Sequence, residues 1–432
     1  MFRTRKSHVI LLGCIALAAL TSIGAEKRAY VIQNAKVYTM AAAGTLERAS
    51  VVIQDGKIAA VGATVKAPAG AQVIDGKGLE VYPGMVNAAG NIGLTEIGSV
   101  DVTNDSVEQG NYKPQLLAFS AIHPASEHIP VARANGITTC LSAPGGGVIA
   151  GQATLIHLDG WTADEMALMK SAGMVMIFPS LGVRRGFRGM GVARAPAPSF
   201  AEARRNYENQ VRELTEWLER ARHYGKARQA DPATAADLQL EALVPVVEGR
   251  LPVFLIADSA RDIRNAVEFA KKEKLKVVLY SGPEVVQTAD LLKKENLPVI
   301  VGPVVRLPGR EDDPYDAPFT VPRDLANAGV KFAIASTGSS DIRNLPYEAG
   351  YAQGFGLSHE DALRSITRNP AEILGIGDKI GSIEAGKIAD LVVTNGDLLE
   401  MRTQVRYVFI AGRPVSLETR HTRLYQQYMA RP

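Results

Sequence analysis

Short apolar runs separated by polar turns mark the first part of the chain. Residues 30–38 and 49–53 are rich in β-branched and aromatic side chains, and a further apolar run follows at 72–75. Asp55 and Gly56 stand between two apolar runs, which is the pattern of a hairpin with a two-residue turn. This region therefore predicts a small β-sheet.

From Pro83 onward, apolar strand-like runs alternate with segments of helical periodicity. The strand-like runs are 136–141, 174–178, 252–256, 276–280, 298–301 and 330–335. Repeated units of this kind predict a parallel sheet covered by helices. A closed barrel and an open doubly wound sheet both satisfy the pattern, and periodicity does not choose between them.

Helix boundaries are indicated at several points. Ser199 and Glu202 form a capping box, which predicts the start of a long helix. A second helix is expected at 260–272, and a third from Ser358 to a stop at 369–370.

After Gly375 short strand-like runs return, at 389–394 and 405–410. We expect the two β-rich ends of the chain to form one sheet. The α/β region would then be inserted between them.

The first 25 residues have the order of a secretory signal. Arg3, Arg5 and Lys6 precede an apolar run at 8–20, and small residues follow. We expect cleavage, and hence a secreted protein in the periplasm or cell envelope of a bacterium, with no transmembrane segment in the mature chain. An uncleaved anchor and lipidation at Cys14 are the alternatives.

Loss of this segment would remove three basic residues and no acidic one, so the formal charge of +3 would fall to zero. A neutral mature chain gives no indication of a nucleic-acid partner. Cys140 would be the one remaining cysteine. Its apolar surroundings predict a buried small side chain rather than a nucleophile.

Four segments carry a resemblance to a known family, namely 53–62, 73–86, 369–375 and 380–393. In residues, order and spacing they resemble the amidohydrolase superfamily, over nearly the whole mature chain. The resemblance implies an α/β fold, with a (β/α)8 TIM-type barrel at 83–375 and a composite β-sandwich from 26–82 and 376–420. It therefore favours the barrel over the open sheet.

The resemblance also implies zinc or another divalent metal at the carboxyl ends of the barrel strands, where it activates water for attack on C–N or ester bonds. The family's ligands are a His-x-His pair, two further histidines and an aspartate. The matching positions of this chain hold Ala89, Asn91, Ile256, Ser281 and Thr337. Alanine and isoleucine cannot coordinate a metal, and the neutral polar side chains are poor zinc ligands. We therefore predict no metal ligands here.

A barrel mouth of this composition predicts a pocket lined by neutral and basic side chains. The residues expected to line it are Asn91, Ser281, Thr337 and Arg343. Asp258, Glu96 and Asp341 are the candidates for acid–base catalysis that needs no metal.

Three other segments each have two interpretations. His123, Glu127 and His128 form either a metal site or a surface turn. The Gly-rich segment 144–152 either binds an anion through its backbone or is a tight loop on the active face. Residues Arg184–Arg194 form either a lid for an acidic substrate or partner, or a solvated loop.

Two functions from different classes follow. The first is a divergent hydrolase of C–N bonds in small-molecule or peptide-like substrates, with a relocated metal or none. The second is a non-catalytic barrel that acts as a binding protein, as a homo-oligomer, or as the partner subunit of an intact amidohydrolase.

Overall fold

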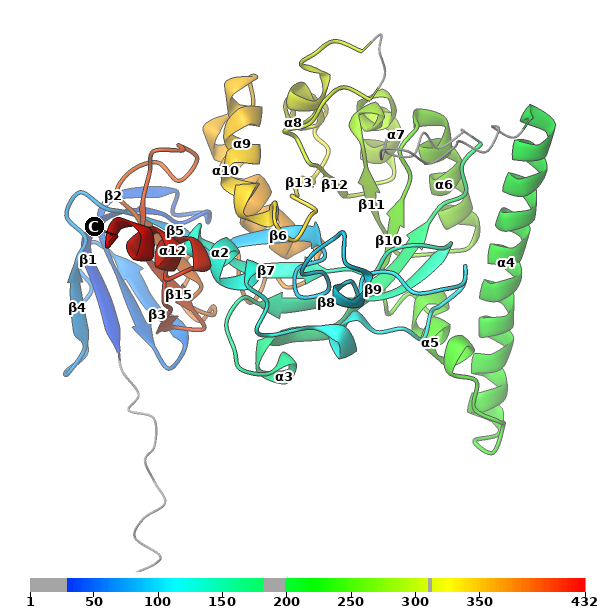
Figure 1. The fold of residues 1–432 in the computed structure, drawn as a ribbon, viewed down its shortest axis with the longest axis horizontal. Coiled ribbons are helices and arrows are strands. Elements are labelled where there is room, and N and C mark those ends of the chain that lie inside the picture. Colours follow the sequence, from blue (N-terminus) through cyan, green and yellow to red (C-terminus); the bar gives the residue numbers. More distant parts are fainter. Residues whose placement is uncertain (1–28, 182–198, 310–312, 432) are drawn as a thin grey trace, which may run out of the picture.

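The computed structural model describes residues 29–181, 199–309 and 313–431. Two sheets organise this part of the chain, one built from both ends of the sequence and one from its middle (Figure 1). The predicted signal at 1–25 and the Arg184–Arg194 segment lie outside the described residues. Within them, no helix has the length and apolar character needed to cross a membrane.

The first sheet joins the two ends of the chain. Its strand order is β16-β15-β14-β5-β1-β2-β3, with β4 beside β1. The strands are β1 Tyr30–Tyr38, β2 Thr45–Gln54, β3 Lys57–Gly62, β4 Gln72–Asp75, β5 Glu80–Pro83, β14 Leu391–Thr394, β15 Val405–Ile410 and β16 Arg413–Pro414. Antiparallel pairing of β5 with β14 makes the connection, so the prediction of one sheet from both ends is confirmed.

The predicted hairpin between β2 and β3 is also present. Asp55 and Gly56 have φ of 51° and 79°. Positive φ at both central residues is what a type I′ turn requires, and Asp followed by Gly reaches it at low cost. The twist of that turn matches the twist of the two strands it joins.

The second sheet is a nearly closed barrel with the order β13-β12-β11-β10-β9-β8-β7-β6. The strands are β6 Met85–Gly90, β7 Ile137–Ser142, β8 Ile149–His157, β9 Ala167–Ile177, β10 Val253–Ile256, β11 Val277–Ser281, β12 Val299–Val301 and β13 Phe332–Ile334. The barrel predicted from the resemblance is therefore present.

The expectation of a wholly parallel sheet is wrong at one strand. β8 runs antiparallel to both β7 and β9, whereas the other neighbours are parallel. The chain between β7 and β8 is too short for a parallel crossover, which needs a dozen or more residues. The Gly-rich segment 144–152 supplies this short return, and β8 begins inside it.

A side chain, rather than a strand ladder, connects the two ends of the barrel. The Asn87 amide of β6 donates from Nδ2 to the Ser336 carbonyl, which follows β13, at 2.9 Å. Its Oδ1 accepts the Ser336 N–H, also at 2.9 Å. Both residues are fully buried. The primary amide thus makes the two hydrogen bonds that a facing peptide group would make.

Helices lie around the barrel, whereas the last helix, α12, lies beside the first sheet (Figure 1). They are α2 His128–Ala134, α3 Ala163–Met166, α4 Phe200–Ala230, α5 Leu238–Val247, α6 Ala260–Lys272, α7 Ala289–Lys294, α8 Ala317–Ala328, α9 Leu345–Gly354, α10 His359–Ile366, α11 Arg368–Ile373 and α12 Arg420–Met429. Four short 3-10 helices are η1 Asp101–Thr103, η2 Ala118–Ala121, η3 Pro283–Thr288 and η4 Ile342–Asn344.

The capping box of α4 and the bounds of α6 are confirmed. The predicted stop at 369–370 is wrong. α10 ends at Ile366, and α11 then runs through Pro370. Pro370 is the third residue of α11, within the first turn, where an N–H has no partner inside the helix and a proline is tolerated.

Buried contacts join the two sheets. His157 Nε2 of β8 lies 2.9 Å from Asp390 Oδ2, just before β14, and both side chains are buried. The other oxygen of Asp390 accepts the N–H of Ala411 at 2.8 Å. Nearby, Asp159 pairs with Arg133 of α2 and Arg413 of β16. Polar contacts therefore hold the first sheet against the barrel.

Candidate ligand-binding site

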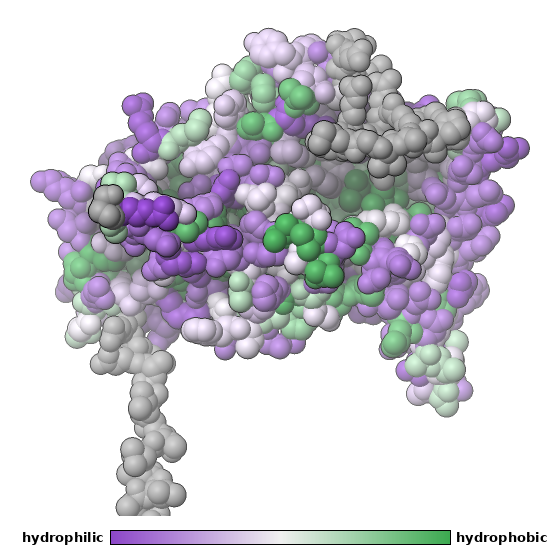
Figure 2. Space-filling model, in the orientation of Figure 1, coloured by the Kyte–Doolittle hydropathy of each residue, from purple (hydrophilic) through white to green (hydrophobic). Residues whose placement is uncertain are grey.

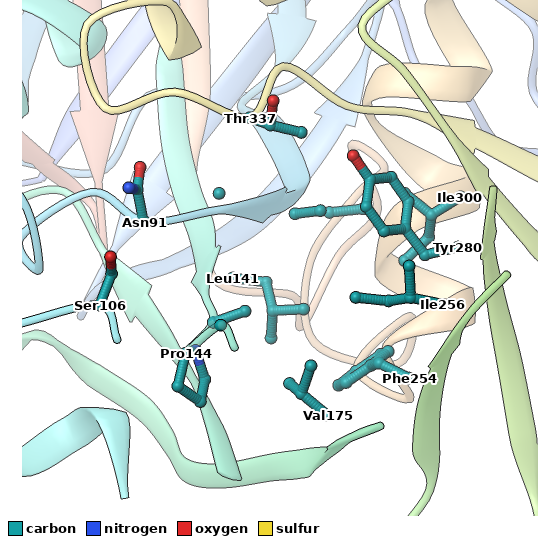
Figure 3. Close-up of a pocket in the computed structure, with 15 residues that line it drawn as sticks. Asn91, Ser106, Leu141, Pro144, Val175, Phe254, Ile256, Tyr280, Ile300 and Thr337 are labelled. Carbon is teal, nitrogen blue, oxygen red and sulfur yellow. The ribbon is translucent and has the colours of Figure 1, made fainter. Parts of the chain in front are cut away.

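A cavity of about 240 Å³ opens at the carboxyl ends of the barrel strands (Figure 3). Its apolar floor is formed by Leu141, Val175, Phe254, Ile256 and Ile300, from four different strands. Its polar groups are Asn91, Ser106, Tyr280 and Thr337. Barrel enzymes place their reacting groups at this end of the strands, so this is the candidate site.

Strand alternation explains which side chains reach the cavity. Residues two apart along a strand point to the same side. Phe254 and Ile256 of β10 therefore share the barrel interior, as do Val278 and Tyr280 of β11. Phe254 stands over Gly173, where an added Cβ would lie 2.4 Å from the ring. A glycine at that position is what allows the phenyl ring to sit in the floor.

The polar groups on the Asn91 side are already paired with their neighbours. Asn91 Nδ2 donates to Thr95 Oγ1 at 3.1 Å, and its Oδ1 accepts from Ser339 Oγ at 2.9 Å. Ser106 Oγ donates to Asn104 Oδ1 at 2.6 Å. These hydrogen bonds fix the wall of the cavity, and they leave little capacity for proton transfer.

Tyr280 differs from this group. Its hydroxyl donates to the Gly302 carbonyl over 3.3 Å, which is long for an O–H···O bond. Burial, followed by the negative charge of Asp258, raises the pKa of the phenol to about 12. Tyr280 is therefore a neutral hydrogen-bonding group at pH 7, next to Thr337 at the mouth (Figure 3).

The three predicted acid–base candidates lie outside the cavity lining. Asp258 is exposed on the loop after β10. The carboxylate of Glu96 accepts from Ser126 Oγ at 2.6 Å and from the Glu127 N–H at 3.1 Å. Asp341 is exposed before η4. Their catalytic roles stay predictions, and Glu96 has a structural role in holding the turn before α2.

Glu348 is a carboxylate that the sequence did not single out. It is buried on α9, and its Oε2 accepts the N–H groups of Val304 and Val305 at 2.5 and 2.7 Å. Burial raises its pKa, against the lowering effect of the two N–H groups. Glu348 therefore shapes the loop after β12, close to the carbonyl that Tyr280 contacts.

The Gly-rich segment contributes directly to the site. Pro144 and Gly145 line the cavity. Gly147 has a φ of 75°, and a Cβ there would lie 2.7 Å from the Asn111 carbonyl. Only glycine fits so close to a neighbouring backbone in that conformation.

Comparisons with known proteins decide the family. The solved structure of an amidohydrolase from Thermotoga maritima MSB8 matches with a TM-score of 0.77 and 26% identity, over 90% of this chain and 99% of that one. The model of the amidohydrolase family matches residues 319–415. The chain belongs to the amidohydrolase superfamily.

Curated relatives match more distantly or over shorter segments. Amidohydrolase tasK of Hapsidospora irregularis is 22% identical over 391 residues, covering 82% of this chain and 39% of that protein. The chain therefore spans about two fifths of the relative's length. Imidazolonepropionase of Acidiphilium cryptum is 40% identical over 77 residues, covering 17% of this chain and 19% of that protein.

Most of the positions predicted to match the family's metal ligands converge. Ala89, Asn91, Ile256 and Thr337 all line the cavity. The fifth, Ser281, does not, and the neighbouring Tyr280 points inward instead. Ser281 lies on a separate cavity of about 10 Å³, and its buried hydroxyl has no hydrogen-bond partner among the described residues.

Arg343, the remaining predicted pocket residue, is also absent from the lining. It lies in η4, and its carbonyl accepts from Asn135 Nδ2 at 2.8 Å.

The cavity does not fit the divalent metal that the family implies. No His, Cys, Asp or Glu is among its lining residues. Across the ranges that the structure describes, no three such side chains meet in a way that could hold a metal ion. Of the internal residues outside these ranges, 182–198 contain none of these four amino acids in their sequence, whereas 310–312 include Glu311 and Asp312. A zinc site needs about three ligands of these types.

The histidine pair before α2 has other partners. His128 Nε2 is 2.8 Å from the Glu96 carbonyl. Glu127 pairs with Arg423 of α12. In the described structure these residues form a hydrogen-bonded turn, which is the simpler of the two interpretations given from sequence.

Proposed function

We propose that this amidohydrolase-superfamily barrel binds a small molecule at its mouth and does not perform the metal-dependent hydrolysis typical of its family. The observation that carries the proposal is the lining of the cavity. Side chains at four of the five family ligand positions face one another there, and none of them is a metal ligand of the usual kind.

The chemistry of hydrolysis supports this proposal. In a metal-dependent hydrolase the ion lowers the pKa of bound water and polarises the carbonyl under attack. Neither task has a substitute among the groups that line the cavity. Asn91 and Ser106 are already hydrogen-bonded within the wall, and Tyr280 is a neutral phenol at pH 7.

We also propose that the barrel acts beside a second, catalytically complete relative in the bacterial cell envelope. The loop around η1 exposes Ile97, Val102 and Val107, and it lies next to Ser106 of the cavity. Figure 2 shows a small apolar group near the centre of the face in view, among other apolar groups on a mostly polar face. In tasK, moreover, the matching segment is part of a much longer chain.

Metal-free hydrolysis is the second candidate, and Asp258 is the observation that favours it. Its charge acts on the Tyr280 phenol, so the carboxylate lies close to the mouth. If it is a general base, Asp258→Asn should lower the hydrolysis of amides by about 100-fold or more. An unchanged rate would remove this candidate.

The test of the main proposal is metal content combined with activity. The purified protein is dialysed and its zinc, manganese, nickel and iron are measured by mass spectrometry against protein concentration. We expect far less than one metal per chain, and no gain in amide, dipeptide or lactam hydrolysis when zinc is added. One tightly retained metal per chain together with zinc-dependent turnover would contradict the proposal.

A further inference from the structure

We propose that the cavity selects an uncharged small molecule with an apolar body and one polar head group, which the Tyr280 hydroxyl contacts. This inference rests on the proposed function, because it takes the cavity to bind its ligand without a metal. It assigns a chemical class to the ligand of this cavity, which the fold alone does not specify.

The first step concerns charge. Of the residues that line the cavity, Tyr280 is the one with an ionisable side chain, and its phenol, with a pKa raised to about 12, is neutral at pH 7. Asp258 and Arg306 lie outside the lining and are exposed to water. A charged ligand group inside would lose its hydration without gaining a partner of opposite charge. That loss is severe in an apolar site.

The second step concerns the body of the ligand. The floor presents branched aliphatic side chains and the Phe254 ring, whose position is fixed against Gly173. A volume of about 240 Å³ lies below the usual range for drug-sized ligands. The ligand is therefore compact, about the size of one aromatic ring with a short chain.

The third step concerns the head group. Asn91 and Ser106 are already hydrogen-bonded on one side of the cavity. Tyr280, on the opposite side in Figure 3, has a side-chain hydrogen bond with Thr337, and it donates its own O–H over the long contact to the Gly302 carbonyl. A ligand carbonyl can replace that weak acceptor with a shorter bond. The phenol is thus the group that orients the ligand, with its head at the mouth and its body on the floor.

Three probes of the same shape test the inference. They are 3-phenylpropanamide, 3-phenylpropanoate and 3-phenylpropylamine, which carry a neutral, a negative and a positive head group at pH 7. Affinities are measured by titration calorimetry and ligand-observed NMR, on metal-analysed protein before and after EDTA treatment. We expect the amide to bind about 10-fold or more tightly than either ion. EDTA should change nothing.

Variants assign the contacts. Tyr280→Phe should weaken the amide about 5- to 10-fold while leaving ethylbenzene, which has no head group, unaffected. Tyr425→Phe, on the exposed face of α12, is the matched control and should change neither. Ile256→Lys places a cation in the lining and should reverse the preference toward 3-phenylpropanoate.

The outcomes separate this inference from the proposed function. Binding of the carboxylate that EDTA abolishes would mean that a metal is present, and the proposed function would fail. If the carboxylate or the amine bound as tightly as the amide after EDTA, the neutral ligand class would be wrong while the metal-free site remained. If no probe bound at millimolar concentration, the ligand class would likewise be wrong. An amide affinity unchanged in Tyr280→Phe would remove the role of the phenol.

Discussion

At the scale of single residues, the direction of one side chain decides what reaches the cavity. Ser281 was placed at a family ligand position, yet Tyr280 is the residue that points inward. A shift of one residue along a strand moves a side chain to the opposite face. The sequence could not correct this error, because a parallel strand buried on both faces is apolar throughout and shows no alternation. The other four positions were placed on the cavity.

Asn87 gives the first prediction at this scale. Asn87→Ala should lower the free energy of unfolding by about 2–4 kcal/mol, because it leaves the N–H and carbonyl of Ser336 buried without partners. Chemical denaturation checks the value. Asn209→Ala, on the exposed face of α4, is the matched control and should cost less than about 0.5 kcal/mol. Equal effects of the two substitutions would contradict the role given to Asn87.

At the scale of elements, boundaries followed from local chemistry, whereas strand direction did not. The capping box at Ser199 and the Asp55-Gly56 turn were readable because each depends on residues a few positions apart. The reversal of β8 depends on a short connection, which was interpreted as a loop alone. The length of this connection indicates the reversal, because six residues between two apolar runs are too few for a crossover helix.

The contact between α10 and the loop after β14 predicts a pH dependence. His359 Nε2 lies 2.9 Å from Asp397 Oδ2. This hydrogen bond raises the pKa of His359 above 6.5, against the effect of burial. Burial alone would raise the pKa of Asp397, but the hydrogen bonds from His359 and the Leu399 N–H, together with nearby positive charge, outweigh it, and the pKa falls below 3.8.

The directions of these two pKa shifts determine how the stability of the protein changes with pH. Stability from His359 is full below pH 6.5 and is lost as pH rises through its raised pKa. Stability from Asp397 is present above pH 3.8 and is lost as pH falls through its lowered pKa.

A double-mutant cycle with His359→Gln and Asp397→Asn should therefore give its largest coupling near pH 5. Both groups are about one third exposed, so we expect about 1 kcal/mol or less there, vanishing by about pH 9. The Arg204–Glu208 pair of α4, an exposed salt bridge without a histidine, is the control. A His359–Asp397 coupling that did not vary with pH would contradict the assignment.

At the scale of the whole molecule, the composite sheet was predictable because both ends of the chain consist of short strand-like runs. The contacts that join this sheet to the barrel were not predictable. His157 and Asp390 are 233 residues apart, and the sequence around each residue does not indicate which side chain it pairs with. Pairings of this kind depend on the final packing, which no short window of sequence contains.

Asp390→Ala should loosen this joint. It leaves His157 and the Ala411 N–H without their buried partner, at a cost of about 2–4 kcal/mol. We expect a lower Tm and faster proteolysis between the first sheet and the barrel, measured by calorimetry and limited digestion. Asp378→Ala, at an exposed turn, is the control. If both variants melted at the wild-type temperature, the joint would not depend on Asp390.

The Asn87 amide has a consequence for motion. β6 keeps its ladder with β7, and β13 keeps its ladder with β12, whether or not Asn87 and Ser336 stay together. The ring can therefore open at this point without breaking a strand ladder, once the two Asn87–Ser336 hydrogen bonds and the contact of Ser339 with Asn91 are lost. Asn91 and Thr337 stand just beyond the two sides of that break. We expect the Ser336 amide to exchange with deuterium sooner than its neighbours, and more slowly once a ligand bridges the gap.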